Sequence, residues 1–319
     1  MTTDPRNPSM PYRKIGRTDL SVSVLGYGTA PFGGAYGAFD PQECKRAVHL
    51  AIDEGINFFD SSPYYGITLS EERLGDALVG RRDKVVLSTK CGRYGLHEFD
   101  FSPKRVTASI DESLCRLKTD YLDLLLVHDV EFGDFCQIVD ETLPAVRKIQ
   151  QQGKARFVGI TGYPLKMLIR IAKQVPVDAI LSYCHYNLMC TDMDLELTPF
   201  ARARGIGLIN ASGLHMGVLT ERGAPDWHPA PTGVIDAGQR AAETCRRHDK
   251  DISTVAVRFC LDHPFVSTTL VGMSSQDEVK GNLRILRQQS DPQLLAEIRA
   301  AIAPDFNFVW PSGKPENNG

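Results

Sequence analysis

The chain has 319 residues, of which 42% are hydrophobic, and its 36 basic and 39 acidic residues leave a formal net charge of −3. This length suffices for one large domain or two ordinary ones, and the balanced charge, without blocks of one sign, argues against a nucleic-acid or membrane-surface partner. No apolar run is long enough to span a bilayer and the N-terminus lacks the apolar core of a signal peptide, so we expect a soluble, cytoplasmic protein.

In chain order, residues 1–10 are expected to be disordered, and residues 12–23 form two strand-like pieces around a Gly-Arg-Thr-Asp turn, which predicts a hairpin. Strands and helices then alternate. Strands are expected at 24–28, 56–60, 84–90, 121–128, 156–161, 177–182, 206–211 and 267–272. Helices are expected at 41–53, 71–79, 103–117, 138–152, 165–174, 193–204, 235–248, 253–262, 275–287 and 292–302.

The predicted strands are apolar throughout rather than alternating, which is typical of a parallel sheet covered on both faces. Eight strand–helix units in one chain without linker-like composition favour a single closed (β/α)8 TIM barrel over residues 11–319, with an N-terminal β-hairpin and a C-terminal helix plus tail. An open dinucleotide-binding sheet predicts a G-x-G-x-x-G turn after the first strand. The turn at 26–34 has neither that spacing nor an immediate helix, so we set this alternative aside.

Polar side chains stand where three neighbouring strands end. The second strand ends at Asp60, with Tyr65 in the loop that follows, and the next two strands end at Lys90 and His128. A helix is expected after the loop that contains Tyr65, with Ser70 as its N-cap. Because parallel barrels gather their strand ends on one face, we expect these four side chains to converge there. The eight scattered cysteines, without a Cys-x-x-Cys pair, favour reduced, mostly buried thiols and no metal.

An acid, a phenol, an ammonium and an imidazole together suit proton transfer at a carbonyl or carbinol oxygen. A phenol of pKa ~10 is a poor acid–base at pH 7, but a nearby ammonium lowers that pKa and a histidine can orient the same oxygen. Asp60 would keep Lys90 charged against burial. The structural alternatives are that Lys90 only pairs with Asp60, that His128 is a satisfied core histidine and that the tyrosines pack.

Several motifs make the chain similar to the aldo-keto reductases: FFDSSPYYG at 58–66, VVLSTKCG at 85–92, DLLLVHD at 123–129 and GKARFVGIT at 153–161. The resemblance implies a catalytic tetrad of Asp60, Tyr65 (not Tyr64), Lys90 and His128. It also implies a nicotinamide cofactor lying extended across the barrel mouth, without a metal, and hydride transfer to or from the substrate carbon while the tyrosine handles the proton.

Within the family, segments such as SPYYGITLSE, HDVEFG and the tail NFVWPSG resemble the aldose 1-dehydrogenases that act on L-galactose or L-fucose. The resemblance implies NAD-dependent oxidation of the anomeric carbon of such a sugar to its lactone. The alternatives are a pyridoxal 4-dehydrogenase-like enzyme, a general aldehyde reductase and a non-catalytic cofactor-binding subunit. We expect a small-molecule aldose as the partner, no nucleic acid, no membrane, and a monomer or weak homodimer.

The resemblance also implies which residues bind the ligands. Cofactor contacts are expected from Gly28, Thr29, Asp60, Thr161, Gly162, Ser182, Tyr183, Ser212, Gly213, Leu214, Gly217, Gly272, Ser274, Ser275, Glu278 and Asn282. Substrate contacts are expected from Tyr65, Arg93, His128, Asp129 and Trp310. The pocket walls are expected in the loop after Lys90, the loop 213–234 and the tail 306–313. Many family members stack an aromatic residue on the nicotinamide where this chain has Ala211, so we expect Tyr183 or Tyr186 to replace it.

The segment after the eighth strand predicts the choice of cofactor. NADP-using relatives place a lysine and an arginine there, which pair with the adenosine 2′-phosphate. Alignment on Asn282 puts Gly272 and Glu278 at those places. A carboxylate repels a 2′-phosphate but accepts a hydrogen bond from a ribose 2′-hydroxyl, so we expect NAD to be preferred over NADP. The structural alternative is that Ser274 and Glu278 simply cap a helix.

Overall fold

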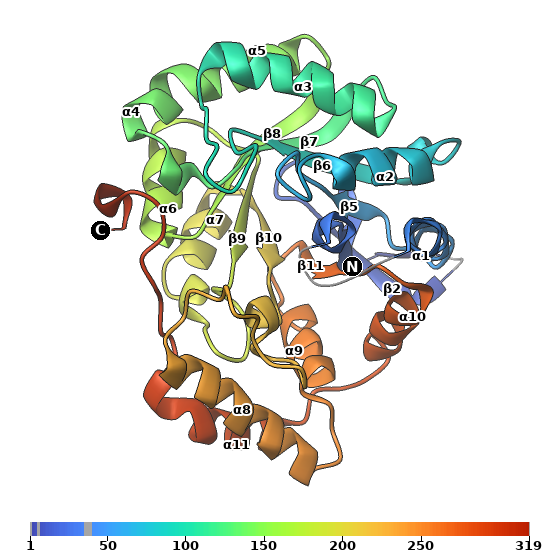
Figure 1. Ribbon diagram of the computed structural model, residues 1–319, viewed down its shortest axis with the longest axis vertical. Coiled ribbons are helices and arrows are strands. Elements are labelled where there is room, and N and C mark those ends of the chain that lie inside the picture. The colour runs from blue at the N-terminus through green and yellow to red at the C-terminus, as the bar shows by residue number, and fades with distance from the viewer. Residues whose placement is uncertain (1, 5–6, 35–39, 319) are drawn as a thin grey trace.

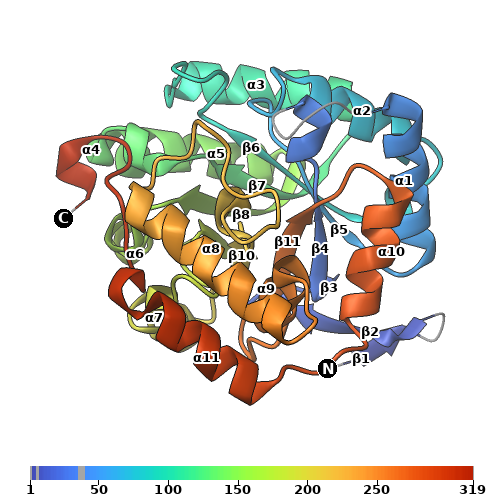
Figure 2. The same cartoon turned by 60° about the horizontal axis from the view of Figure 1, so that its bottom comes forward.

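The computed structural model describes residues 2–4, 7–34 and 40–318. Eight parallel strands in this part of the chain close into a barrel in the order β10-β11-β4-β5-β6-β7-β8-β9 (Figures 1 and 2), which confirms the predicted fold. The barrel strands are β4 (Leu25–Gly28), β5 (Phe58–Asp60), β6 (Val86–Cys91), β7 (Leu122–Val127), β8 (Ala155–Gly162), β9 (Ala179–Tyr183), β10 (Gly207–Ala211) and β11 (Thr268–Gly272).

Helices surround the strands on the outside, as the turned view in Figure 2 shows. They are α1 (Pro41–Asp53), α2 (Leu69–Leu78), α3 (Pro103–Leu117), α4 (Phe135–Gln137), α5 (Leu143–Gln151), α6 (Leu165–Gln174), α7 (Leu197–Arg204), α8 (Thr232–Arg247), α9 (Ile252–Leu261), α10 (Gln276–Ile285) and α11 (Pro292–Ile302). Helix α11 packs on α8, and the tail that follows runs past α6 toward α4 (Figures 1 and 2). No helix in the described ranges has the length and apolar character needed to cross a membrane.

Apolar side chains fill the barrel interior because alternate residues of each strand point inward. One buried cluster joins Phe58, Leu124, Leu126, Ala179, Leu181, Ile209 and Leu270 from five different strands, and it also contains Ile15, Leu20 and Val22. The last three belong to the N-terminal hairpin of β2 (Asn7–Lys14) and β3 (Ser21–Ser23), whose register pairs Tyr12 with Ser23. The hairpin therefore covers the N-terminal end of the barrel. The active sites of such barrels lie at the opposite, C-terminal end.

The N-terminus differs from the expectation of disorder over residues 1–10. Residues Thr2–Asp4 form strand β1, which pairs antiparallel with β2, and β2 already begins at Asn7. Met10 is fully buried in the main core, so apolar burial as well as strand pairing orders this segment. Residues 1, 5 and 6 of the expected disordered stretch lie outside the described residues.

Several helix boundaries also differ from expectation. Helix α2 starts at Leu69 with Thr68 as N-cap, so the prediction of Ser70 as the cap is wrong. The Ser70 hydroxyl instead donates to the carbonyl of Thr29 at 3.0 Å, a partner distant in sequence. The helix expected at 138–152 comprises a π-helical turn at Ile138–Thr142 followed by α5, and the helix expected at 193–204 is α-helical only from Leu197.

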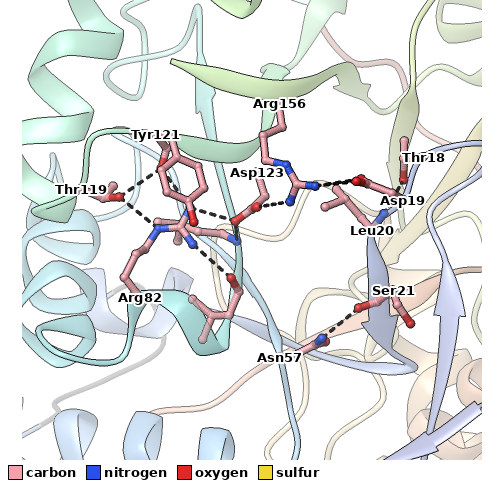
Figure 3. A network of polar contacts seen from close by, with 12 residues as sticks. Thr18, Asp19, Leu20, Ser21, Asn57, Arg82, Thr119, Tyr121, Asp123 and Arg156 are labelled. Atoms are coloured by element: carbon pink, nitrogen blue, oxygen red, sulfur yellow. Dashed lines mark hydrogen bonds and ion pairs between the residues drawn. The ribbon is translucent and has the colours of Figure 1, made fainter. Parts of the chain in front are cut away.

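A polar network at the N-terminal end of the barrel fastens the hairpin to the strands (Figure 3). The carboxylate of Asp123 on β7, which is 3% exposed, accepts hydrogen bonds from Arg82 at 2.8 Å, from Arg156 at 2.8 Å and from the amide of Leu87 at 2.9 Å. Arg156 also donates to Asp19 in the hairpin turn at 2.9 Å. The buried Asp123 carboxylate thus links β6, β7 and β8, and through Arg156 it is connected to the N-terminal hairpin.

We expect the substitution Asp123→Asn to lower the free energy of unfolding by about 2 kcal/mol, because the buried amide cannot replace the charged hydrogen bonds to the partly exposed Arg82 and Arg156. Asp19→Asn is the matched control: its carboxylate contacts the same Arg156 but is largely exposed, so we expect a loss below about 1 kcal/mol. Guanidinium denaturation measures both. Equal midpoints for the two variants would contradict the assigned role of Asp123.

Candidate active site

The side chains expected to converge do meet at the C-terminal mouth of the barrel. Asp60 is the last residue of β5, Lys90 stands near the end of β6, and His128 directly follows β7. Each continues the inward-facing set of its strand, since Phe58, Val86 and Leu126 pack in the interior cluster two or four residues earlier. All three are nearly inaccessible, with exposures of 2%, 1% and 5% in that order. The alternation along the strands thus places a carboxylate, an ammonium and an imidazole close together at the mouth.

Lys90 is the centre of this cluster. Its ammonium donates to Asp60 Oδ2 at 2.5 Å and to the carbonyl of Ser61 at 2.8 Å, and it lies 4.7 Å from the centroid of the Tyr65 ring. Burial lowers the pKa of Lys90, but the Asp60 carboxylate and the Tyr65 hydroxyl, which accepts a hydrogen bond from the ammonium, outweigh it, so that the pKa is raised. Lys90 therefore carries its charge at neutral pH.

Tyr65 and His128 face each other across the mouth. Their rings meet edge to face, with centroids 5.9 Å apart and an interplanar angle of 89°. Burial raises the pKa of the Tyr65 phenol, and the Asp60 charge adds to this, so the lowering by Lys90 is overcome. Lys90 thus lowers this pKa, as expected, but it does not bring the pKa below its ordinary value. The phenol is protonated at neutral pH.

His128 is held in its neutral form. Burial lowers its pKa well below the ordinary value, and the positive charges of Lys90 and Arg93 lower it further. Its Nδ1 lies 3.1 Å from the Ser62 hydroxyl, and its Nε2 lies 3.6 Å from Asp129 Oδ2. A neutral imidazole has one N–H, so it can donate a single hydrogen bond to an oxygen bound beside Tyr65.

Two of the expected substrate residues adjoin this cluster. Arg93 donates to Asp129 Oδ2 at 2.5 Å, and its guanidinium stacks on the Tyr64 ring at 3.7 Å. Asp129 adopts a left-handed backbone conformation, with φ of 50°, directly after His128. Strain of this kind in a non-glycine residue is concentrated at binding sites. Arg93 and Asp129 thus bring a fixed cation and a carboxylate next to His128.

Trp310 lies in a different part of the mouth. Its ring stacks on Tyr163 with centroids 4.6 Å apart and meets His215 and His228 edge to face. His185 packs on the same Tyr163 and pairs with Asp192 at 2.7 Å. The tail and the loop after β10 therefore share one aromatic wall on the side of β8 and β9.

The expected cofactor residues fall into two groups. Most stand at or just after the C-terminal ends of barrel strands: Gly28, Thr29, Asp60, Thr161, Gly162, Ser182, Tyr183, Ser212, Gly213, Leu214, Gly217 and Gly272. The loop after β10 is unusual, since Ser212, His215 and Met216 all have positive φ. Ser182 and Asn210 alternate with Leu181 and Ile209, which lie in the barrel interior, so their side chains face the surrounding helices, where Asn210 donates to the Tyr186 carbonyl at 3.0 Å. The strained backbone after β10 fits an extended polar ligand.

The second group begins α10, where the structure assigns a capping role. The Ser275 hydroxyl accepts from the Glu278 amide at 3.2 Å, while Glu278 Oε2 accepts from the amides of Ser274 at 2.6 Å and Ser275 at 3.1 Å, which forms a capping box. The Asn282 side chain donates to the Glu278 carbonyl at 2.9 Å. The Glu278 carboxylate thus accepts hydrogen bonds from the amides of Ser274 and Ser275, two of the residues expected to bind the cofactor.

Of the two tyrosines proposed to stack on the nicotinamide, Tyr186 does not reach the mouth. Its ring stacks on Phe259 of α9, with centroids 5.1 Å apart, and meets His263 edge to face in the helical layer. Tyr183 ends β9 on the same face as Leu181, which lies in the barrel interior. Only Tyr183 is therefore placed for such stacking.

The sequence pattern of the aldo/keto reductase family matches residues 24–303. The chain belongs to this family. It is 45% identical over 316 residues to L-galactose dehydrogenase from Arabidopsis thaliana, covering 96% of this chain and 98% of that protein. It is 30% identical to D-threo-aldose 1-dehydrogenase from a Pseudomonas species, covering 88% and 94%. Among solved structures, the holo form of an aldo-keto reductase from Bacillus halodurans superimposes with a TM-score of 0.78 at 26% identity, over 97% and 100% of the two chains.

Membership of the aldo/keto reductases makes the protein an oxidoreductase and implies a nicotinamide cofactor. The strained loop after β10, where Ser212, His215 and Met216 have positive φ, fits such a group. Two buried residues in the quoted motifs were missed as site residues. Ser62 lies in FFDSSPYYG and contacts His128, while Glu131 lies in HDVEFG. The motifs themselves do not indicate a role for these two residues, because their contacts are with residues from distant parts of the chain.

Glu131 fastens the C-terminal tail to the mouth. Its Oε1 accepts from the Tyr163 amide at 3.1 Å, the Tyr183 hydroxyl at 3.2 Å and the Ser312 hydroxyl at 3.1 Å. Its backbone carbonyl accepts from the Lys314 amide at 2.9 Å and the Asn317 side chain at 2.8 Å. The side chain is fully buried, and burial together with the Asp129 charge raises its pKa to about 8. Glu131 is therefore mostly protonated at neutral pH.

This raised pKa predicts a pH-dependent stability. Between pH 4.5 and about 8 the unfolded chain releases a proton that folded Glu131 keeps, so the free energy of unfolding should fall as pH rises, approaching roughly 1.4 kcal/mol per unit, and level off above pH 8. We expect Glu131→Gln to remove this component, as measured by denaturation across the pH range. Glu316→Gln, an exposed change in the same tail, should leave the wild-type slope. An unchanged slope in Glu131→Gln would refute the prediction.

Proposed function

We propose that this protein is an aldose 1-dehydrogenase that oxidises the anomeric carbon of L-galactose, L-fucose or a related sugar to the lactone. The observation that carries the proposal is the cluster of Tyr65, Lys90, Asp60 and His128 at the mouth of a barrel of the aldo/keto reductase family. The sugar class comes from the relatives, since L-galactose dehydrogenase and D-threo-aldose 1-dehydrogenase match almost the whole chain.

In this proposal the C1 hydroxyl of the sugar lies between Tyr65 and His128. Tyr65 takes the hydroxyl proton as general base, Lys90 stabilises the phenolate that this requires, and His128 donates a hydrogen bond to the reacting oxygen. The bound nicotinamide would accept the hydride from C1. Because the Tyr65 pKa is raised in the free protein, oxidation should become faster as pH rises toward that pKa.

Arg93 and Asp129 are proposed to bind further hydroxyl groups of the sugar. A charged pair fixed beside His128 offers N–H donors and a carboxylate acceptor, and a polyol can use both. Trp310, on the tail, is proposed to contribute an apolar surface from the other side of the mouth. Thr161, Gly162, Tyr183 and the loop after β10 are proposed to hold the cofactor.

A substrate panel tests the proposal. Reduction of NAD would be followed with L-galactose, L-fucose, D-arabinose and pyridoxal, while cofactor binding is measured separately from the quenching of protein fluorescence. We expect turnover with at least one of the sugars. Turnover of pyridoxal alone would indicate a pyridoxal 4-dehydrogenase-like enzyme, and cofactor binding without any turnover would favour a non-catalytic subunit.

We propose that NAD is preferred over NADP, by tenfold or more in kcat/KM, about 1.4 kcal/mol. The basis is the Glu278 carboxylate at the start of α10, where a negative charge disfavours a 2′-phosphate. Glu278→Arg should shift the ratio of the two kcat/KM values toward NADP. Since this change also removes the capping box, Glu278→Gln is the control that keeps the cap without the charge. Equal efficiency of the wild-type enzyme with both cofactors would refute this selection.

A further inference from the structure

Ser62 is a fully buried serine that makes direct contact with His128. It lies in the loop after β5, two residues beyond Asp60, and its hydroxyl has two polar neighbours in the described part of the chain. The amide of Tyr64 donates to Ser62 Oγ at 3.1 Å, and His128 Nδ1 lies 3.1 Å from the same oxygen. The proposed reaction does not use this hydroxyl directly.

The direction of the Ser62–His128 hydrogen bond follows from the other contact. A backbone N–H can only donate, so Tyr64 uses a lone pair of Ser62 Oγ and leaves the hydroxyl proton available. Within the described residues, His128 Nδ1 is the only acceptor within hydrogen-bond distance of that proton. If Nδ1 carried the ring proton instead, the buried Ser62 proton would have no acceptor, which is costly. Ser62 therefore donates and Nδ1 accepts.

The second nitrogen of His128 then carries the proton. Burial, together with the charges of Lys90 and Arg93, disfavours the doubly protonated imidazolium. The neutral ring therefore has one N–H, and an accepting Nδ1 places it on Nε2. Nε2 lies 3.6 Å from Asp129 Oδ2, too far for a hydrogen bond, and that oxygen is already engaged by Arg93 at 2.5 Å. The Nε2 proton thus remains available to an oxygen bound at the mouth.

We propose that Ser62 is a positioning residue that fixes His128 in the Nε2–H tautomer, so that His128 donates to the substrate oxygen reacting at Tyr65. The part that concerns the substrate rests on the proposed function, whereas the tautomer is a property of the free protein. Ser62 acts only through His128 and has no contact with the reacting atoms. Without its hydroxyl, the ring is free to place its proton on Nδ1 and present a lone pair, which repels an oxygen acceptor.

The nitrogen-15 chemical shifts of the histidine rings distinguish the two tautomers, and the His128 signal is assigned by its loss in His128→Asn. We expect the wild-type protein without ligands to show the Nε2–H tautomer. Ser62→Ala should show a mixture, with kcat lowered roughly tenfold, KM for the sugar changed less, and cofactor affinity unchanged. Ser62→Thr, which keeps the hydroxyl, should restore the tautomer and most of the rate.

An Nδ1–H tautomer in the wild-type protein would overturn the proposal, and so would an unchanged Nε2–H tautomer in Ser62→Ala. The wild-type measurement needs no variant, so it decides the matter even where a substitution at this buried position impairs folding. The outcome is also separate from that of the substrate panel. A tautomer change in Ser62→Ala without turnover of any sugar would uphold the positioning role and reject the proposed substrate.

Discussion

Replacing Tyr65 by phenylalanine is expected to lower the rate of sugar oxidation by at least ~10²-fold, the scale of a lost general acid–base. The ring that faces His128 stays in place, and only the hydroxyl that accepts a hydrogen bond from Lys90 is removed. We therefore expect the fold and the cofactor affinity to remain nearly unchanged. Steady-state kinetics with the best sugar of the panel, and fluorescence titration with NAD, measure the two effects separately.

The matched control is Tyr64→Phe in the adjacent position. The Tyr64 ring lies under the Arg93 guanidinium at 3.7 Å, and phenylalanine preserves that stacking surface. If Tyr65 is the acid–base, Tyr64→Phe should keep kcat within about threefold of wild type. Near-normal turnover in Tyr65→Phe, or an equal loss in both variants, would remove the chemical role from Tyr65 and leave packing as its function.

The barrel was predictable because its signals are local. The helices at 103–117, 165–174 and 292–302 were expected with the boundaries that the structure has. Two of them begin with a polar cap and a proline, Ser102-Pro103 and Asp291-Pro292, and such signals act within a few residues. The convergence of Asp60, Lys90 and His128 followed from strand ends alone, since parallel strands of a closed barrel deliver them to one face.

The features that sequence reasoning missed depend on contacts between distant parts of the chain. Ser70 is a residue type that often caps helices, but its hydroxyl donates to the carbonyl of Thr29, which follows the neighbouring strand β4. Glu131 accepts hydrogen bonds from Tyr163, Tyr183 and Ser312, and no local sequence pattern predicts these contacts. The net direction of the Tyr65 pKa could not be predicted for a related reason: the ammonium that lowers it is visible in the motif, whereas the extent of the burial that raises it is known only from the folded chain.

Replacing Lys90 by methionine is expected to lower turnover by a similar factor, at least ~10²-fold, but through its effect on the pKa of Tyr65. The ammonium lowers the pKa of Tyr65 against burial and the Asp60 charge. Without it the phenol resists ionisation more strongly. The rising limb of the pH–rate profile should therefore move to higher pH in Lys90→Met, a shift that simple loss of folded protein cannot produce.

Lys90→Met also leaves the buried Asp60 carboxylate without its ion pair, a change that by itself destabilises proteins by several kcal/mol. The double variant Lys90→Met with Asp60→Asn separates stability from chemistry, because it removes both charges. We expect it to regain most of the lost stability in denaturation experiments while the rate stays low and the pH profile stays displaced. If the double variant regained the rate as well, Lys90 would serve only to neutralise Asp60, and the phenolate of Tyr65 would need no ammonium.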